Sequence, residues 1–284
     1  MNGGYDKMKK SKKILAVLLT VVLGATMALA TGCGSSSGSK DNSWNYIKKR
    51  GKLIIGLDDT FAPMGFRDKN NKIVGFDIDL AKQVGKELGI KVEFKPIDWD
   101  AKEAELKSKK IDCIWNGLSA TPGRQKSMSL SHKYMKNRIL IMSSDKSLKI
   151  KNASQLKKIK LGTQAGSSAL EAIQKDKHYD EFKDNVKTYD DYNAALLDMK
   201  AGRIDAVAID EVYAIYNNKS KTKLYESPYN FGADYYAVGF RKGDKALTKK
   251  VNTAIGKAVK NGSAAKISKK WFGKNMTIDE GYSK

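Results

Sequence analysis

Two successive series of alternating strands and helices constrain the fold of this chain more than any other feature of its sequence. In the first series, the short apolar run at 52–57 precedes a stretch at 77–88 whose apolar residues recur at the spacing of one helix face. Strands are predicted at 91–96 and 111–115, and a charged helix is predicted at 101–110. Such alternation is typical of parallel sheets covered by helices, so the sequence predicts an α/β fold.

The second series has the same character as the first. Its predicted strands and helices lie at residues 160–163, 167–175, 192–200 and 206–209. The two series also share an internal echo, because Lys-Lys-Ile-Asp at 109–112 and Gly-Arg-Ile-Asp at 202–205 each lead into a buried strand. Two similar series indicate two α/β lobes. Ligands of parallel sheets bind beyond the carboxyl ends of the strands, so we expect a ligand cleft between the lobes.

The end of the sequence predicts a return of the chain to the first lobe. A strand is predicted at 230–240, followed by helices at 246–261 and 263–271. We expect two crossover strands, near 134–138 and 231–235, to join the lobes as hinges. The predicted organisation is a signal peptide at 1–32, a tether at 33–43, a first lobe at 44–136 and 233–276, a second lobe at 137–232, and a tail at 277–284.

The N-terminal segment has the composition of an export signal. Lysines at 9–13 precede an apolar run at 14–30, and small residues then lead to Cys33. This order is typical of a signal peptide that ends at a lipidated cysteine. The glycine- and serine-rich stretch after Cys33 is typical of a flexible tether. We therefore expect an extracytoplasmic protein that is lipid-anchored to the cell membrane, of the kind found on a Gram-positive cell surface.

An uncleaved membrane anchor is the alternative for residues 14–30. The run is only at the lower limit of length for a transmembrane helix. Ala30 stands three residues before Cys33, where leucine is commoner in such signals, and Met8 begins a more usual signal opening than Met1. The small residues directly before the cysteine favour cleavage and lipidation.

The composition argues against several kinds of partner. Only two cysteines are present, so once Cys33 carries lipid, Cys113 has no disulfide partner and is predicted to be a buried core residue. His132 and His178 lack neighbouring metal ligands, and we expect no metal and no cofactor. The formal net charge is +22, and removing the leader, with five lysines and one aspartate, leaves +18. The lysines are dispersed rather than clustered with aromatic residues, so no nucleic acid partner is expected.

Six short motifs occur in order along the chain. They are DDTFAPMGF at 58–66, VGFDIDL at 74–80, NGLSATPGR at 116–124, GTQAGSS at 162–168, IDAVAID at 204–210, and a terminal segment at 261–273 that starts NGS and ends KWFG. Each motif alone is weak, but together they make the chain resemble the polar amino-acid-binding proteins of ABC importers from about residue 44 to residue 272. The resemblance implies the two-lobed type II periplasmic-binding-protein-like fold, with a ligand cleft and two hinge strands.

The resemblance assigns the ligand α-carboxylate to Arg124. A zwitterion that enters a closed cleft loses hydration at both charges, so each charge must be paired and hydrogen-bonded. The planar guanidinium of Arg124 matches a carboxylate, although a solvated arginine at a helix start is the alternative. Gly166, Ser167 and Ser168 follow a strand and open a helix, so their N–H groups can bind the same carboxylate from the other lobe. An ordinary serine cap is the alternative there.

The α-ammonium is assigned to Asp210 by the same resemblance. Asp210 ends a strand of the second lobe, and the alternative is that it caps the following helix. Ser119 and the carbonyl of Gly117 would supply the remaining ammonium contacts, because glycine allows a close backbone approach. Ligand contacts divided between two lobes should favour closure of the cleft on binding.

The ligand side chain is expected to lie near two aromatic residues and one acid. Phe61 and Trp99 occupy positions where the resembled family places aromatic residues, with plain core packing as the alternative. Asp58 contacts the ligand side chain in both basic and glutamine-type binders of that family, while Asp59 and Gln164 depart from familiar variants and can tune the site. The acidic pair favours arginine or lysine as ligand, and glutamine, cystine and other polar amino acids are alternatives.

The function indicated is that of a monomeric receptor, not an enzyme, that delivers a polar amino acid to the membrane permease and ATPase subunits of an ABC importer. A dehydratase of prephenate- or arogenate-like acids is an alternative on the same architecture. It would need a positioned acid or base, and only Glu211 and the pair of Asp58 and Asp59 are candidates. A ligand sensor without transport is the third possibility.

Overall fold

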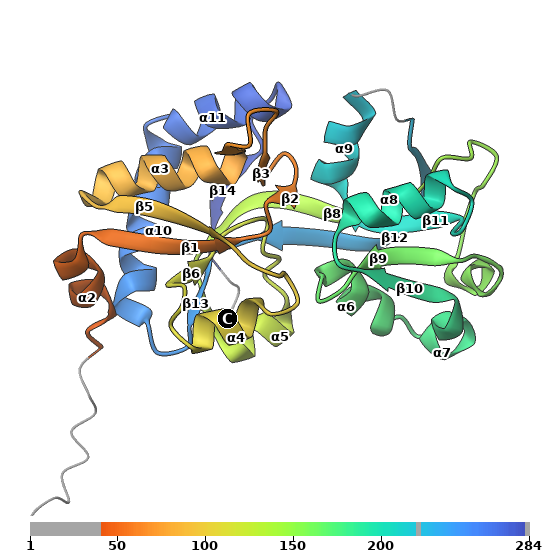
Figure 1. The fold of residues 1–284 in the computed structure, drawn as a ribbon, viewed down its shortest axis with the longest axis horizontal. Coiled ribbons are helices and arrows are strands. Elements are labelled where there is room, and N and C mark those ends of the chain that lie inside the picture. The colour runs from red at the N-terminus through yellow and green to blue at the C-terminus, as the bar shows by residue number, and fades with distance from the viewer. Residues whose placement is uncertain (1–40, 220–222, 282–284) are drawn as a thin grey trace, which may run out of the picture. The chain divides into compact units, whose positions relative to one another are not determined.

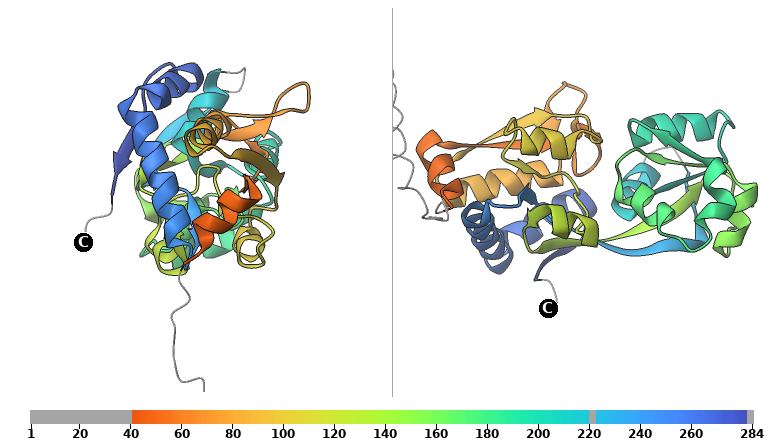
Figure 2. Two further views of the ribbon diagram at one scale, coloured as in Figure 1. Left: turned by 90° about the vertical axis from the view of Figure 1, so that its left-hand side faces the viewer. Right: turned by 90° about the horizontal axis from the view of Figure 1, so that it is seen from below.

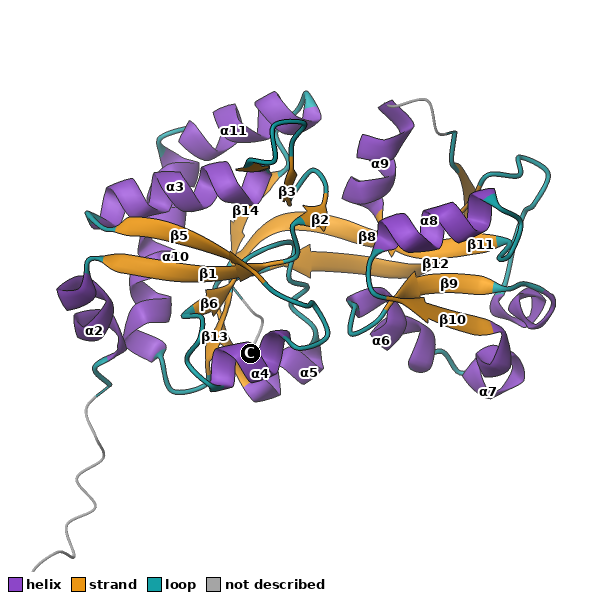
Figure 3. Cartoon of the chain, in the orientation of Figure 1, coloured by secondary structure: helices purple, strands orange, loops and turns teal. Residues whose placement is uncertain are grey.

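The computed structural model describes residues 41–219 and 223–281. The predicted signal peptide, Cys33 and most of the predicted tether lie outside these ranges. The described residues form two α/β lobes, each with its own central sheet and its own helices packed against that sheet (Figures 1 and 3). The predicted two-lobed α/β fold class is therefore confirmed.

The sheet of the first lobe has the strand order β5-β1-β6-β13-β7. Its strands are β1 (Lys52–Leu57), β5 (Lys91–Pro96), β6 (Cys113–Ile114), β7 (Met128–Leu130) and β13 (Gly239–Arg241). β1 is parallel to β5 and β6, whereas β13 is antiparallel to β6 and β7. The helices of this lobe are α2 (Ser43–Arg50), α3 (Phe76–Leu88), α4 (Lys102–Lys107), α5 (Pro122–Ser127), α10 (Lys245–Lys260) and α11 (Ser263–Phe272). A small separate sheet contains β2 (Thr60–Phe61), β3 (Gly65–Arg67) and β4 (Ile73–Val74).

The sheet of the second lobe has the strand order β10-β9-β11-β8-β12. Its strands are β8 (Lys133–Ser143), β9 (Leu161–Gln164), β10 (Val186–Tyr189), β11 (Ala206–Asp210) and β12 (Tyr225–Tyr236). β9 is parallel to β10 and β11, and β8 is antiparallel to β11 and β12. The helices of this lobe are η1 (Ala153–Lys158), α6 (Ser168–Gln174), α7 (Tyr179–Phe182), η2 (Lys183–Asn185), α8 (Tyr192–Lys200) and α9 (Glu211–Lys219).

Two paired strands, β8 and β12, run between the lobes (Figure 2, right). The segments predicted as hinges, 134–138 and 231–235, lie within these strands. At the first-lobe end, Ser119 forms a β-bridge with Tyr236. The pairing of β12 with β8 shifts register on either side of Asn230, which is typical of a strand that bends.

The C-terminal segment differs from the sequence-based organisation. Residues 277–284 were expected to form a tail, but β14 (Thr277–Glu280) pairs with the start of β8, where Thr277 lies opposite Met135. The sequence of β14 shows no apolar alternation, so its strand conformation depends on the backbone groups that β8 offers at its edge. The predicted helix at 101–110 is also shorter, since α4 ends at Lys107 and Lys109 has a left-handed φ of 62°.

The repeated Ile-Asp sequence, at 111–112 and 204–205, makes the same contacts in each lobe. The carboxylate of Asp112 accepts the N–H of Ile54 at 2.7 Å, and that of Asp205 accepts the N–H of Lys160 at 2.7 Å. The isoleucine before each aspartate packs on a glycine of the neighbouring parallel strand. A Cβ on Gly56 would lie 2.5 Å from Ile111 Cδ1, and a Cβ on Gly162 would lie 2.5 Å from Ile204 Cδ1. Glycine at both positions therefore lets the strand and the isoleucine approach closely.

Cys113 is fully buried, as predicted, and the nearby Trp115 is also fully buried. Both belong to the main apolar cluster, which spans helices and strands of both lobes. Burial raises the pKa of the Cys113 thiol well above its ordinary value. This cysteine is therefore a small core residue rather than a reactive thiol.

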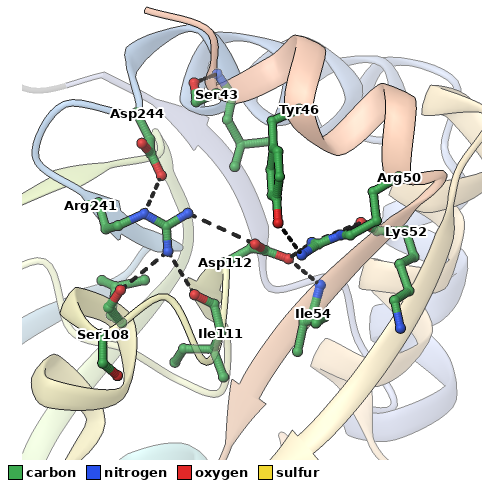
Figure 4. A network of polar contacts seen from close by, with 12 residues as sticks. Ser43, Tyr46, Arg50, Lys52, Ile54, Ser108, Ile111, Asp112, Arg241 and Asp244 are labelled. Atoms are coloured by element: carbon green, nitrogen blue, oxygen red, sulfur yellow. Dashed lines mark hydrogen bonds and ion pairs between the residues drawn. The ribbon is translucent and has the colours of Figure 1, made fainter.

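A buried carboxylate, Asp112, ties α2 to the first-lobe sheet (Figure 4). Asp112 is 2% exposed and forms an ion pair with Arg50 of α2. Arg241 of β13 lies 3.8 Å from the same carboxylate and forms a second ion pair with Asp244 at 2.8 Å. Because α2 is the first described element, this network holds the beginning of the lobe in place.

We expect Asp112→Ala to lower the free energy of unfolding by about 3 kcal/mol, because it leaves two partly buried guanidinium groups without this carboxylate. Urea denaturation followed by circular dichroism measures the change. The matched control is Glu93→Ala, which removes an exposed partner of Lys52 and should leave the unfolding midpoint near that of the wild type. Equal effects of the two variants would contradict the role of Asp112.

A second buried carboxylate, Asp77, supports the loop after β6 from the first turn of α3. Its Oδ2 accepts the N–H of Gly117 at 2.7 Å and the hydroxyl of Tyr134 at 2.9 Å. Complete burial raises the pKa of Asp77 from 3.8 to about 7. The carboxyl is thus costly to ionise, although its hydrogen bonds favour the ionised form.

The raised pKa of Asp77 predicts a pH-dependent loss of stability. A carboxyl with a higher pKa in the folded state stabilises the fold fully below about pH 4, and this contribution is lost as the pH rises through about 7. Asn at this position cannot ionise, and its amide oxygen can accept the same two hydrogen bonds. We therefore expect Asp77→Asn to gain stability relative to the wild type between pH 4 and pH 7.5.

Free energies of unfolding from urea titrations at several pH values test this prediction. Asp184→Asn, which changes an exposed aspartate, is the control and should keep the wild-type pH profile. A constant difference between Asp77→Asn and the wild type across this pH range would show that ionisation of Asp77 does not destabilise the fold.

Candidate functional site

A polar cleft lies between the lobes, at the carboxyl ends of their parallel strands. In this arrangement the cleft is nearly closed and leaves about 10 Å³ of space for a water-sized molecule. Its lining comprises Asp58, Phe61, Trp99, Asn116, Gly117, Arg124, Gln164, Ser167, Ser168, Tyr192 and Asp210. Asp58 follows β1, Asn116 follows β6, Gln164 ends β9 and Asp210 ends β11. This is the position where open α/β sheets place their ligands.

All the residues predicted to contact the ligand line this cleft except Ser119 and Gly166. The Ser119 hydroxyl instead donates to Ser168 Oγ at 2.8 Å or to Asp234 Oδ2 at 2.7 Å. Asp59, expected to tune the site, does not line the cleft and forms an ion pair with Arg67 at 2.5 Å. Its neighbour Asp58 turns inward, so the two adjacent acids do not act as a pair.

Arg124 is 6% exposed and points into the cleft from α5. Thr121 caps this helix and accepts the N–H of Arg124 at 3.3 Å, while proline occupies the first helical position. The guanidinium donates to the Ser119 carbonyl at 3.0 Å and to the Gly166 carbonyl at 3.2 Å. Arg124 therefore contacts backbone of both lobes, and within the described ranges it forms no ion pair.

Ser167 caps α6, since its hydroxyl accepts the N–H of Leu170 at 3.1 Å. The cap and the cleft lining are compatible, because Ser167 and Ser168 are both nearly buried and both border the cleft. Gln164, the last residue of β9, donates from its side chain to Asp58 Oδ2 at 2.7 Å and so joins the second lobe to the first.

Asp210 is 4% exposed and accepts three side-chain hydrogen bonds. Asn137 Nδ2 donates at 2.6 Å, the Tyr236 hydroxyl at 2.7 Å and the Tyr192 hydroxyl at 3.2 Å. Burial, and then the charge of Asp234, raise the pKa of Asp210 from 3.8 to about 7. The carboxylate therefore faces the cleft rather than capping α9.

A chain of hydrogen bonds connects Asp210 to the serine end of the cleft. Asn137 Nδ2 donates to Asp234 Oδ2 at 2.8 Å as well as to Asp210. Asp234 in turn accepts from Ser119, which contacts Ser168. Since Asn137 lies in β8 and Asp234 in β12, the strands that join the lobes also contribute to the polar surroundings of the site.

The opposite end of the cleft combines an acid with aromatic rings. Asp58 accepts the N–H of Thr60 at 2.9 Å and its hydroxyl at 2.7 Å, and burial raises the pKa of Asp58 above its ordinary value. Phe61 stacks on Tyr213 with ring centroids 5.6 Å apart. Gly117, with a φ of 60°, approaches the Phe61 ring so closely that a Cβ would lie 2.6 Å from Phe61 Cε1. Any larger residue would displace the aromatic wall.

Sequence reasoning missed five residues of this region. Asn116 and Tyr192 line the cleft, and Asn137, Asp234 and Tyr236 surround Asp210. Asn116 could have been found, because it directly follows a predicted strand. The polar residues of β8 and β12 carried a weaker signal, namely side chains that interrupt otherwise apolar strands.

Within residues 41–219 and 223–281, no helix has both the length and the apolar character needed to cross a membrane, and the predicted apolar leader lies outside these ranges. Within the same ranges, no group of three His, Cys, Asp or Glu side chains is placed to hold a metal ion.

Known proteins similar to this chain are binding proteins for amino acids. The L-cystine-binding protein TcyJ of Escherichia coli (strain K12) is 32% identical over 253 residues, which cover 88% of this chain and 94% of that protein. The arginine-binding extracellular protein ArtP of Bacillus subtilis (strain 168) is 32% identical over 262 residues, which cover 90% of this chain and 97% of that protein.

A solved structure shows the same similarity. An ABC uptake transporter substrate-binding protein from Streptococcus pneumoniae, with bound histidine, matches with a TM-score of 0.73 and 38% sequence identity. The match covers 84% of this chain and 99% of that chain. Each of these three proteins is named for binding, so the comparisons do not favour the enzyme alternative.

The family model for bacterial extracellular solute-binding proteins, family 3, matches residues 53–274. This range includes both lobes and nearly all of the described residues. The resemblance inferred from the motifs is thereby confirmed. The chain belongs to the bacterial extracellular solute-binding proteins of family 3, and it is an amino-acid receptor that works with an ABC importer.

Proposed function

We propose that the cleft binds the amino acid with its α-carboxylate on Arg124 and its α-ammonium on Asp210. The observation that carries this proposal is a buried guanidinium and a buried carboxylate that line one enclosed cleft. Among the described residues neither forms an ion pair. A buried charge is costly unless it is paired, and a zwitterion supplies both missing partners at once.

The remaining ligand contacts are proposals too. Ser167 and Ser168 would add contacts to the α-carboxylate, and Ser119 and the Gly117 carbonyl would add contacts to the α-ammonium. Asp58 would face the side chain, with Phe61 and Trp99 as apolar walls and Gln164 as a polar neighbour.

A cationic side chain, that of arginine or lysine, is the proposed preference. Asp58 is 8% exposed and, among the described residues, has hydrogen-bond donors but no cation beside it. A ligand cation would balance its charge, and the aromatic walls would favour the same cation. Cystine is the main competitor, because its second ammonium group could reach Asp58 in the same way.

The finer cellular assignments are proposals as well. We propose lipid attachment at Cys33 on a Gram-positive cell surface, a monomeric state, no catalytic activity, and delivery to a permease and an ATPase. The proposed lobe boundaries are 44–136 with 233–276, and 137–232. The order of basic, apolar and small residues before Cys33 supports the anchor, and the division of the strands between two sheets supports the boundaries.

A thermal-shift panel of the common amino acids with cystine and ornithine tests the proposed ligand class. A ligand at 100 times its Kd stabilises the folded state by about 2.7 kcal/mol, which corresponds to roughly 5–10 °C for a domain of this size. We expect such shifts with L-arginine or L-lysine, and none with Arg124→Met. The exposed change Arg203→Met is the control and should respond as the wild type does.

The outcomes of this panel separate the parts of the proposal. A response to glutamine or cystine, with none to arginine or lysine, would contradict the cationic preference. A wild-type response in Arg124→Met would contradict the carboxylate site, and no response to any amino acid would contradict the function itself.

The raised pKa of Asp210 predicts that affinity depends on pH. Only the ionised carboxylate can pair with an ammonium, and burial raises the pKa of Asp210 to about 7. The Kd for L-arginine should therefore be constant above about pH 8 and rise as the pH falls below 7, approaching tenfold per unit. Binding should also take place with release of a proton in that range.

Isothermal titration calorimetry in buffers of different ionisation enthalpy measures both effects. Asp210→Asn should bind more weakly and lose most of the pH dependence. Asp77→Asn is the control, since Asp77 also titrates near pH 7 but does not line the cleft, and it should keep the wild-type dependence. If Asp77→Asn loses the pH dependence of binding and Asp210→Asn keeps it, the dependence belongs to Asp77 and the prediction for Asp210 is wrong.

A further inference from the structure

Lys102, the first residue of α4, is a buried lysine with an unusual set of partners. Its side chain is nearly inaccessible, with 4% of the residue exposed. The ammonium donates to the Trp99 carbonyl at 2.9 Å and to the Gly166 carbonyl at 2.8 Å, and it lies 5.0 Å from the centre of the Trp99 ring. Within the described ranges it forms no ion pair. Its partners are thus two carbonyl groups and one aromatic face.

The two carbonyl groups belong to different lobes. Trp99 lies in the first lobe, between β5 and α4, whereas Gly166 lies in the second lobe, between β9 and α6. The bond from Lys102 to Gly166 therefore exists only while the lobes are together. When the lobes separate, Lys102 keeps the Trp99 carbonyl of its own lobe, and water must replace the bond between Lys102 and Gly166, since polar groups need hydrogen bonds in either state.

Gly166 is shaped for this contact. Its φ of 62° is left-handed, and a Cβ at this position would lie 2.5 Å from Asp100 Oδ1 and 3.2 Å from Lys102 Nζ. The loop before α6 therefore approaches the start of α4 as closely as a backbone can. The Gly166 loop and the start of α4 are therefore in close backbone contact across the two lobes.

The same Gly166 carbonyl also accepts from Arg124 at 3.2 Å. Burial, and then the charge of Arg124, lower the pKa of Lys102 to about 8, so the ammonium remains mostly charged at neutral pH. If Arg124 turns its guanidinium toward a ligand carboxylate, its bond to Gly166 weakens. Lys102 then keeps the carbonyl satisfied, which avoids the 1–3 kcal/mol cost that is typical of a buried acceptor without a donor.

We propose that Lys102 is a positioning residue that latches the Gly166 loop of the second lobe against the first lobe and thereby slows release of the bound amino acid. This inference rests on the proposed function. Lys102 does not line the cleft and need not touch the ligand. Its effect is on the lifetime of the closed arrangement, and through Arg124 on the freedom of the guanidinium to bind a carboxylate.

Stopped-flow kinetics with L-arginine as the probe, repeated with L-cystine, test this proposal. Lys102→Met keeps the apolar stem over Trp99 but removes the donors, and we expect its dissociation rate to rise about tenfold while the association rate stays within about twofold. Lys102→Arg keeps charge and donors and should recover part of the slow dissociation. Lys107→Met, at the exposed end of the same helix, is the matched control and should behave as the wild type.

Each possible result of these measurements either supports or overturns the proposed latch. A wild-type dissociation rate in Lys102→Met would overturn the latch, and so would a loss that appears only in the association rate. Urea midpoints of all three variants exclude unfolding as the cause, and if Lys102→Met is unfolded, the comparison of Lys102→Arg with the wild type decides. Binding of neither amino acid by the wild type would overturn the proposed ligands, and the latch with them.

Discussion

The antiparallel pairing of β8 with β12 is the constraint on which the rest of the structure depends. The two strands belong to the second-lobe sheet, and their ends reach the first lobe, where Ala237 donates to the Leu118 carbonyl at 2.8 Å. The same strands carry Asn137, Asp234 and Tyr236 to the carboxylate of Asp210. Because hinge and site share these side chains, a change in the angle between the lobes changes the surroundings of Asp210 directly. Closure and the proposed binding of an ammonium group at Asp210 would therefore be coupled through contacts rather than over a distance.

Buried charge without a counterion is the second organising feature. Arg124, Lys102 and Asp210 are each nearly inaccessible, and among the described residues each has only neutral hydrogen-bond partners. Such an arrangement costs stability, as the raised pKa of Asp210 shows. A structure optimised for stability alone would pair or remove these groups. For Arg124 and Asp210, which line the cleft, the proposed ligand would supply the missing partners, so that the free energy of binding would include the relief of this cost.

Local patterns predicted the parts of the protein that depend on neighbours in the chain. The alternation of strands and helices led to both sheets, and the repeated Ile-Asp unit led to two lobes, because Asp112 and Asp205 each bind the start of an adjacent strand. Asp58, Gln164 and Asp210 come from strand ends, where the parallel topology brings them together, and all the predicted site residues but Ser119 and Gly166 line the cleft. No such local signal indicated that β14 would pair with β8. None indicated that Asp58 would line the cleft while Asp59 pairs with Arg67 outside it. The partners of Asp210 had no such signal either, since Asn137 lies 73 residues away from it in sequence.

By itself, the sequence determined the α/β class, the family and the types of charge that a polar amino acid requires, since periodicity and strand-end motifs depend on short stretches of chain. Only the tertiary structure decided which charges lack counterions, which acid faces the cleft, and that Lys102 meets Gly166 across the lobes. These properties follow from burial and from contacts between distant segments. Whether a lysine is a solvated surface group or a buried latch depends on the groups that the fold places around it. The spacing of residues along the chain does not predict those groups.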